Sequence, residues 1–184
     1  MVAECACLLA SLRGAINVYR VDTADGEEKL SHSVPVIEKA DRINCLFGNL
    51  ARAHALISGR RQLTRDDLWP VLEITFDSAP PIRAKIFRHL IEKGGTLDTL
   101  DIERLLRCAA PTARKEMEAL SVLGVVDKTE KEGQAHTITL AETYSWFCST
   151  DCKELFERRL GYMPEAQLLK EVRSVFPNAV GLLQ

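Results

Sequence analysis

The segment from Pro80 to Leu140 constrains the fold more than any other part of this 184-residue chain. After Pro81, apolar residues recur at spacings of three and four up to a pair of glycines, which predicts a helix with prolines in its first turn. A short strand is expected over 96–98, and Thr99 is expected to cap a second helix. The positions predicted to be buried on these two helices are Ile82, Ile86, Phe87, Leu90, Ile91, Leu100, Ile102, Leu105 and Leu106.

A third helix and a hairpin are expected after a tight turn. Pro111 fits a first helical position, so this helix is expected from Thr112 to Leu123, with Gly124 as a left-handed C-cap. Its predicted buried positions are Ala113, Met117, Leu120 and Leu123. Extended runs at 125–129 and 136–140 flank a charged turn, which predicts a β-hairpin. Helix, strand, helix, turn, helix and hairpin is the element order of a winged helix-turn-helix domain, a scaffold typical of nucleic-acid binding that does not by itself fix function.

The third helix and the hairpin carry the polar residues expected to bind DNA. In helix-turn-helix proteins the N-terminal turn of the recognition helix enters the major groove, and basic side chains nearby contact phosphates. The candidate DNA-binding residues are Thr112, Arg114, Lys115, Glu118, Lys128 and Lys131. A solvated helix face that binds nothing remains the alternative, because the segment from Pro80 to Leu140 has ten Lys and Arg against nine Asp and Glu.

The first 79 residues have a different pattern. The expected elements are a helix over 5–13, extended segments over 16–21 and 30–37 around a turn at 24–28, and a helix over 39–58. One face of that last helix is expected to hold Ile43, Leu46, Phe47, Leu50, His54 and Ile57. Thr64 and Asp67 have the spacing of a capping box and predict another helix through Phe76. Pro70 is expected to kink or break this helix near 66–69.

Several runs in this region resemble the C-terminal lid of AAA+ ATPases of the MoxR and replication-initiator kind. These runs are Asp41-Arg42, Leu50 to Arg60 with its Gly-Arg pair, and Leu63 to Leu68. The longer stretch through Trp146-Phe147 is similar to the C-terminal region of large bacterial and archaeal ATP-binding proteins. The resemblance implies a helical lid that leads into a winged helix. It also implies that Arg42, eighteen residues before Arg60, is a sensor-2 arginine that reaches the γ-phosphate of a bound nucleotide. Asp41 departs from the family, which has proline there, and the alternative for Arg42 is a solvated arginine.

Motifs for catalysis by the chain itself are absent from the sequence. It contains neither a Gly-x-x-x-x-Gly-Lys-[Ser/Thr] phosphate loop nor an apolar strand ending in Asp-Glu. We therefore expect no enzymatic activity, and ATP as a cofactor only if the chain is joined to an upstream ATPase domain. The six cysteines are scattered, and their spacing predicts reduced thiols and no metal site.

Composition and patterning complete the expectations. A net charge of -2 excludes a strong long-range attraction to nucleic acid, so binding must come from a local patch. The chain start lacks the features of a signal peptide and no run is long enough to span a membrane, so a cytoplasmic location is expected. After the hairpin, helices are expected over 141–184, including one over 165–176 whose apolar stripe suits partner contact or homodimer formation. Packing of this helix within the chain is the alternative.

The sequence thus predicts a mainly α fold with a small β-hairpin wing, divided into a lid-like region (1–79), a winged helix-turn-helix domain (80–140) and a C-terminal helical extension (141–184). The preferred function is double-stranded DNA binding, by a transcriptional regulator or by the DNA-targeting end of an ATPase. Two alternatives remain: an ATPase lid fragment, and a protein-interaction module that does not bind DNA.

Overall fold

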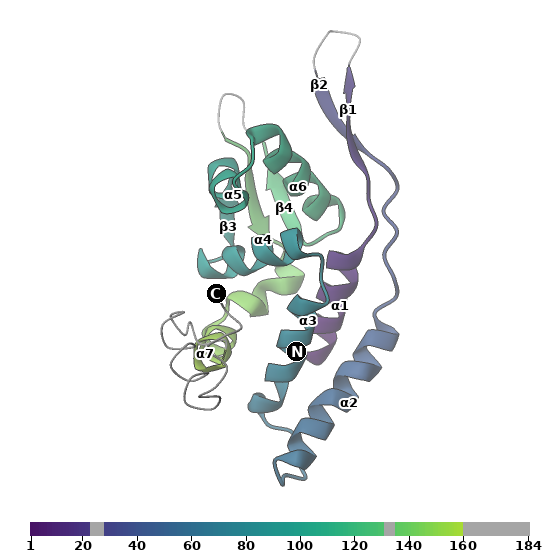
Figure 1. Ribbon diagram of the computed structural model, residues 1–184, viewed down its shortest axis with the longest axis vertical. Helices are drawn as coiled ribbons and strands as arrows, with labels where there is room; N and C mark the ends of the chain where they lie inside the picture. Colours follow the sequence, from purple (N-terminus) through teal and green to yellow (C-terminus); the bar gives the residue numbers. More distant parts are fainter. Residues whose placement is uncertain (23–27, 131–134, 160–184) are drawn as a thin grey trace, which may run out of the picture.

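The computed structural model is mainly helical, and its described residues also form two small antiparallel sheets (Figure 1). It describes residues 1–22, 28–130 and 135–159. Its helices are α1 (Val2–Arg13), α2 (Asp41–Ile57), the 3-10 helix η1 (Arg65–Leu68), α3 (Trp69–Asp77), α4 (Pro81–Glu92), α5 (Thr99–Leu106), α6 (Ala110–Val122), the 3-10 helix η2 (Glu142–Cys148) and α7 (Thr150–Arg159). Its strands are β1 (Val18–Asp22), β2 (Glu28–His32), β3 (Thr96–Asp98), β4 (Val126–Thr129) and β5 (Thr137–Leu140).

The N-terminal part consists of α1, α2 and α3, which pack against one another, and of a long hairpin between α1 and α2 (Figure 1). In that hairpin β1 pairs with β2 from Val18 opposite His32 to Asp22 opposite Glu28. The second extended segment is shorter than the predicted 30–37, because beyond His32 it makes only an isolated bridge between Ala15 and Val36. The predicted turn at 24–28 lies almost wholly outside the described residues.

Helix α2 buries only part of the face that was predicted. Ile43, Phe47, Ala51 and Ala55 follow one another at intervals of four and are buried, whereas Leu46 is 59% exposed and Ile57 is 88% exposed. The prediction weighted large apolar residues, but α1 and α3 cover only one side of α2. Small alanines on that side allow the helices to approach closely. The prediction that Leu46 and Ile57 are buried was therefore wrong.

The expected break at Pro70 is confirmed. Thr64 begins the 3-10 helix η1 with the predicted capping box, and α3 starts afresh at Trp69 with Pro70 in its first turn. A proline in that position removes no intrahelical hydrogen bond, since the first N–H groups of a helix have no partner within it.

The region from Pro81 to Leu140 contains the helices and strands predicted for it. Strand β5 lies between β3 and β4, so the sheet order is β3-β5-β4 with all pairs antiparallel. Gly124 has a φ of 70°, which confirms the left-handed end of α6. Ile82 and Leu100 are each 49% exposed, so their predicted burial was wrong; each stands at the start of its helix, outside the face that the neighbouring helices cover.

The cap of α5 also differs from the prediction. Asp98, not Thr99, is the N-cap, and its carboxylate accepts a hydrogen bond from the backbone N–H of Asp101 at 2.8 Å. Thr99 is instead buried, and its hydroxyl donates to the carbonyl oxygen of His136 at 3.1 Å. Thr99 therefore ties α5 to the start of β5, a long-range contact that a local capping pattern does not contain.

A continuous buried cluster runs through all three of the predicted segments. Arg83 at the start of α4 donates to the carbonyl oxygens of Leu12 and Gly14, both at 2.7 Å, and so caps the end of α1. The hydroxyl groups of Ser11 and Tyr144 are hydrogen-bonded at 3.1 Å, which joins α1 to η2. The N-terminal helices therefore form part of the same core as the helices and strands that follow.

Gly14 marks a close approach between the end of α1 and the end of α6. A β-carbon at Gly14 would lie 2.4 Å from Leu123 Cδ2, 3.0 Å from Ser11 O and 3.1 Å from Ile37 Cγ1. We expect Gly14→Ala to lower the free energy of unfolding by roughly 1 to 2 kcal/mol, because overpacking forces buried neighbours to move. In α2, a β-carbon added at Gly48 would meet no neighbouring atom within 4 Å. Gly48→Ala should therefore raise the free energy of unfolding by roughly 0.5 to 1 kcal/mol. Urea denaturation measures both, and a Gly14→Ala variant as stable as Gly48→Ala would contradict this packing.

Within residues 1–22, 28–130 and 135–159, every helix is too short or too polar to cross a lipid bilayer.

Candidate nucleic-acid interface

The N-terminal turn of α6 is open to solvent. Pro111, Thr112 and Arg114 are exposed and Lys115 is half-buried, whereas Ala113 on the other side of the helix is fully buried. Pro111 has no N–H and the Thr112 N–H donates to the carbonyl oxygen of Ala109 at 2.9 Å, so this turn would attract an anion chiefly through the helix dipole and its side chains. Of the candidate residues on this helix, Thr112 and Arg114 are exposed, whereas Lys115 and Glu118 are half-buried.

The hairpin β1–β2 lies alongside α6, and both strands pack against it (Figure 1). A cavity of about 220 Å³ opens between the two, lined by Arg20 and Lys29 together with Leu30, Pro111 and Arg114. Residues of three elements, two arginines and a lysine among them, thus line one space. Arg20 and Lys29 lie on opposite faces of the hairpin ladder, since Arg20 pairs with Leu30 and Lys29 pairs with Val21. We call this space the basic cavity.

Glu118 and Lys128 are brought together by the structure but are engaged with each other. Lys128 Nζ donates to Glu118 Oε2 at 2.6 Å, and also forms an ion pair with Glu130. The side chain of Lys128 is only 9% exposed. Burial would lower the pKa of Lys128, but the hydrogen bonds to Glu118 and Glu130 outweigh it and raise the pKa. This lysine joins α6 to β4, and phosphate binding would have to displace two carboxylates from it.

Lys131, the remaining candidate residue on the hairpin, lies outside the described residues, as does the predicted helix over 165–176.

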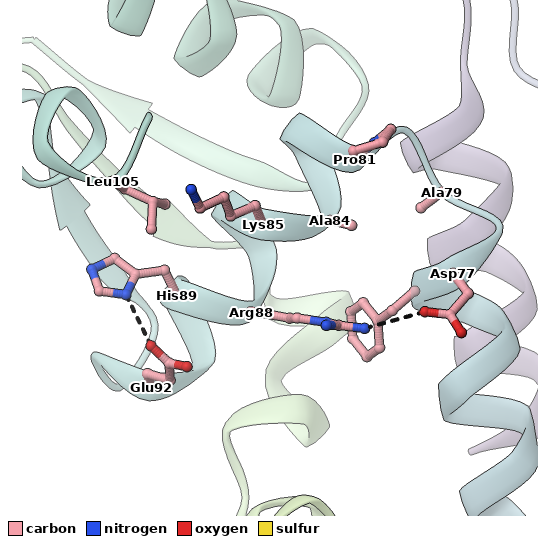
Figure 2. Close-up of a pocket in the computed structure, with 10 residues that line it drawn as sticks. Asp77, Ala79, Pro81, Ala84, Lys85, Arg88, His89, Glu92 and Leu105 are labelled. Carbon is pink, nitrogen blue, oxygen red and sulfur yellow. Dashed lines mark hydrogen bonds and ion pairs between the residues drawn. The ribbon is translucent and has the colours of Figure 1, made fainter. Parts of the chain in front are cut away.

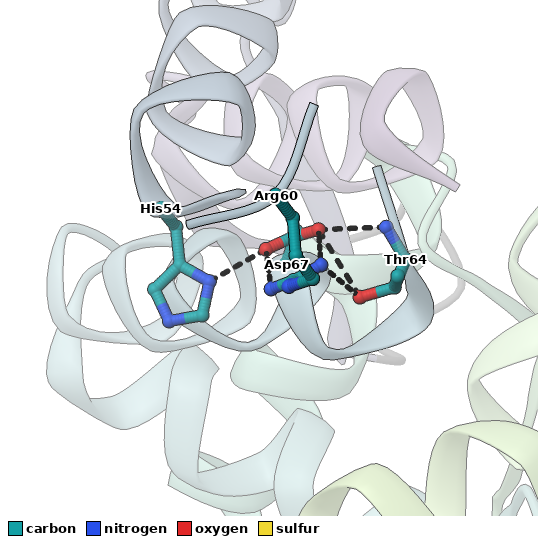
Figure 3. A network of polar contacts seen from close by, with 4 residues as sticks. All are labelled: His54, Arg60, Thr64 and Asp67. Carbon is teal, nitrogen blue, oxygen red and sulfur yellow. Dashed lines mark hydrogen bonds and ion pairs between the residues drawn. The ribbon is translucent and has the colours of Figure 1, made fainter. Parts of the chain in front are cut away.

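Four residues from the runs that resemble the lid, His54, Arg60, Thr64 and Asp67, form a polar network at the junction of α2 and η1 (Figure 3). The Arg60 guanidinium donates to both oxygens of the Asp67 carboxylate at 2.7 Å, and the Thr64 backbone N–H donates to Oδ2 at 2.7 Å. His54 Nδ1 is 2.7 Å from Oδ1 of Asp67, and Arg60 also donates to the Thr64 hydroxyl. The hydrogen bonds from Arg60 hold the pKa of Asp67 far below its usual range. In this chain the Gly-Arg and Thr-x-x-Asp runs therefore hold the C-terminal end of α2 against η1.

Arg42 lies at the opposite end of α2, in its first turn, and is exposed. The length of α2 separates it from the Arg60 network by about 25 Å, at 1.5 Å per residue. Within this chain the structure does not bring Arg42 to a phosphate-binding loop or to the basic cavity.

A second, larger hollow of about 450 Å³ lies between α3, α4 and α5 (Figure 2). Four of its five titratable side chains are paired with one another, Arg88 with Asp77 at 3.6 Å and His89 with Glu92 at 2.9 Å, and Lys85 is the fifth. Arg88 also lies over the ring of Phe76, with its guanidinium carbon 5.0 Å from the ring centre. These pairs leave the hollow with little net charge.

Among the described residues no cluster of metal ligands is found, and Cys5 and Cys152 are buried. No group of three or more His, Cys, Asp and Glu side chains in that part of the chain could hold a metal ion. Burial raises the pKa of Cys5 and of Cys152 to about 12 each, so both thiols stay protonated near neutral pH.

No family model, curated protein or solved structure showed a significant match to this chain.

Sequence reasoning missed Arg20 and Lys29. Both lie on the hairpin, which the sequence pattern assigned to the lid-like region and not to the DNA-binding face. The available signal was one basic residue, Arg20, in the extended segment predicted over 16–21 and another, Lys29, just before the segment predicted over 30–37. Nothing in the pattern showed that this hairpin would pack against a helix about ninety residues later.

Proposed function

We propose that this chain is a non-catalytic protein that binds double-stranded DNA, with residues 80–140 as a winged helix-turn-helix unit and α6 as its recognition helix. The observation that carries the proposal is the first turn of α6, where Thr112 and Arg114 are exposed, Lys115 is half-buried, and Arg114 lines the basic cavity. The order of α4, β3, α5, α6, β4 and β5, with the sheet order β3-β5-β4, is the arrangement expected of a winged helix.

The chemistry of these residues suits duplex DNA. Arg114 can form two parallel hydrogen bonds to a phosphate or to the edge of a guanine, and Thr112 can donate to a phosphate oxygen. Lys115 adds a compact charge one residue further along the helix. Lys128 is left out of the proposed interface because Glu118 and Glu130 neutralise it.

A fluorescence-anisotropy titration with a labelled random duplex tests the proposal. We expect binding that weakens as salt is raised from about 50 to 200 mM, since each displaced counterion contributes to the salt dependence. The Arg114→Gln/Lys115→Gln variant should bind at least about tenfold more weakly, because it loses contacts to phosphates or bases.

The matched control is Lys39→Gln/Arg52→Gln, which removes the same charge at exposed positions before and within α2. This control should bind like the unmodified chain. Equal weakening by the two double variants would show that net charge alone matters, and no binding of the unmodified chain at about 50 mM salt would refute DNA binding.

The outward side of α2 favours a second candidate function, contact with another protein or domain. Leu46, Leu56 and Ile57 are between 59% and 88% exposed there, and Arg42 lies on the same side of the helix. In an ATPase lid such a face would meet the upstream nucleotide-binding domain; in a free-standing chain it could meet a second copy, as could the C-terminal helices. A flat DNA titration, together with self-association in analytical ultracentrifugation, would favour this function over the first.

A further inference from the structure

Helix α2 carries a second line of apolar residues beside the one that it buries. Leu46, Leu50, Ala53 and Ile57 follow one another at intervals of four, three and four, the spacing of the seam in a coiled coil. Leu46 is 59% exposed and Ile57 is 88% exposed, and Ala53 is exposed between them. Leu50 is half-buried and packs against the core. We call these four residues the α2 stripe, and it lies open along the border of the described core.

The shape of the α2 stripe suits a single helix laid alongside α2. From Leu46 to Ile57 the stripe is about 17 Å long, which is three helical turns. The small side chain of Ala53 in its middle allows close approach of two backbones. Arg42 and Asn49, each four residues before a member of the stripe, are exposed and border it on the solvent side. The stripe is therefore narrow, whereas a helix that lies on a lipid surface needs a broad apolar face.

The charge around the α2 stripe is positive. No Asp or Glu occurs between Asp41 and Asp66, a segment that contains five arginines. Arg60 and Arg65 are paired with carboxylates of η1 and α7, whereas Arg42, Arg52 and Arg61 are exposed.

This charge distinguishes between the possible occupants. A second copy of the chain would set arginines against arginines, because α2 has no carboxylate after Asp41 to pair with them. A partner helix with Glu or Asp beside its apolar residues would instead be attracted, as in the charge pairs that flank a coiled-coil seam. Charge complementarity therefore favours an acidic helix of another protein over a second copy.

We propose that the α2 stripe is a docking site for an acidic amphipathic helix of another protein. The apolar residues of that helix meet Leu46, Ala53 and Ile57, and its carboxylates meet Arg42 at one end of the stripe and Arg61 beyond the other. The inference rests on the second candidate function and gives its partner a chemistry. It is independent of DNA binding, since Figure 1 shows α2 and α6 in different halves of the molecule.

The test is a fluorescence-anisotropy titration of a labelled synthetic peptide with the whole chain. The peptide consists of three repeats of Ile-Ala-Glu-Leu-Glu-Ala-Glu, which place Ile and Leu on a seam and Glu on both sides of it. A matched peptide has Lys in place of every Glu. We expect the acidic peptide to bind at least about tenfold more tightly than the lysine peptide, and its affinity to fall as salt is raised.

Apolar variants locate the binding. Leu46→Ser/Ile57→Ser should bind the acidic peptide at least about tenfold more weakly, because two apolar contacts are lost. Ile82→Ser/Leu100→Ser is the matched control, since it changes two residues of α4 and α5 that are each 49% exposed, and it should keep the affinity. Circular dichroism should show that both variants fold like the unmodified chain.

Charge variants test the polar part of the site. Arg42→Gln/Arg61→Gln should weaken binding of the acidic peptide and reduce its salt dependence. Lys93→Gln/Arg104→Gln removes the same charge at exposed positions away from α2 and should change neither.

Several results would overturn the inference. Unchanged affinity of Leu46→Ser/Ile57→Ser, or equal binding of the two peptides, would show that the α2 stripe does not select an acidic helix. If the chain binds no peptide but self-associates in analytical ultracentrifugation, the second candidate function stands with a second copy as the occupant. Binding only to phosphatidylserine vesicles would assign the stripe to a lipid surface. If the chain shows none of these, the second candidate function fails together with the inference.

Discussion

Replacing Phe87 by alanine is expected to lower the free energy of unfolding by about 3 to 5 kcal/mol. Phe87 in α4 has no exposed surface, and its ring centre lies 5.9 Å from that of Phe76 in α3. It also meets Tyr144 at 6.5 Å and Phe147 at 5.3 Å, both edge to face, from the 3-10 helix η2. Alanine would lose the transfer free energy of the ring and leave a cavity where α3, α4 and η2 meet.

Urea denaturation measures this loss, and Phe87→Leu is the control, since an apolar side chain that fills most of the space should cost less. The two tryptophans allow a sharper test, because Trp69 lies in α3 and Trp146 in η2. In the single-tryptophan variants Trp69→Phe and Trp146→Phe, fluorescence should report one shared transition, and Phe87→Ala should move it equally in both. Separate transitions would contradict a core that is continuous between the N-terminal helices and η2.

Asp67→Asn is expected to lower the free energy of unfolding by roughly 2 to 3 kcal/mol at neutral pH. The Asp67 side chain is only 1% exposed and accepts hydrogen bonds from Arg60, Thr64 and His54. An amide in its place cannot accept at both ends, so Arg60 loses its paired contact and the start of η1 loses a cap. Thermal unfolding followed by circular dichroism measures the effect. Asp66→Asn, which changes the neighbouring carboxylate, serves as the control and should leave stability nearly unchanged.

The effect of Asp67→Asn should also depend on pH. The pKa of Asp67 is depressed in the folded chain, chiefly by the hydrogen bonds from Arg60, and is near 3.9 in an unfolded chain. Its contribution is therefore fully present above about pH 5 and is lost as the pH falls below about 4. The stability difference between the unmodified chain and Asp67→Asn, measured by urea denaturation at pH 6 and pH 3, should shrink at the lower pH. A difference that is the same at both values would show that Asp67 is not held as a carboxylate.

Local patterns predicted the helices of this protein well and their exposed sides less well. The spacing of apolar residues predicted α4 and α6, and Gly124 marked the end of α6, because helix formation and capping depend on residues three or four positions apart. Burial of a side chain depends in addition on which other helices and strands pack against its helix. Leu46 and Ile57 fit an apolar stripe on α2, yet α1 and α3 cover the side that carries Ala51 and Ala55.

Part of the candidate site follows from local sequence patterns, and part of it depends on contacts between distant segments. The sequence by itself determined that Thr112, Arg114 and Lys115 fall at the start of a helix, since Pro111 fits a first helical turn and the apolar spacing that follows it fits a helix. Only the tertiary structure decided that Glu118 and Glu130 neutralise Lys128 and that the hairpin carrying Arg20 and Lys29 lies beside Arg114. These are contacts between distant segments. Their geometry depends on how the hairpin and the helices pack, and the spacing of residues along the chain does not predict it.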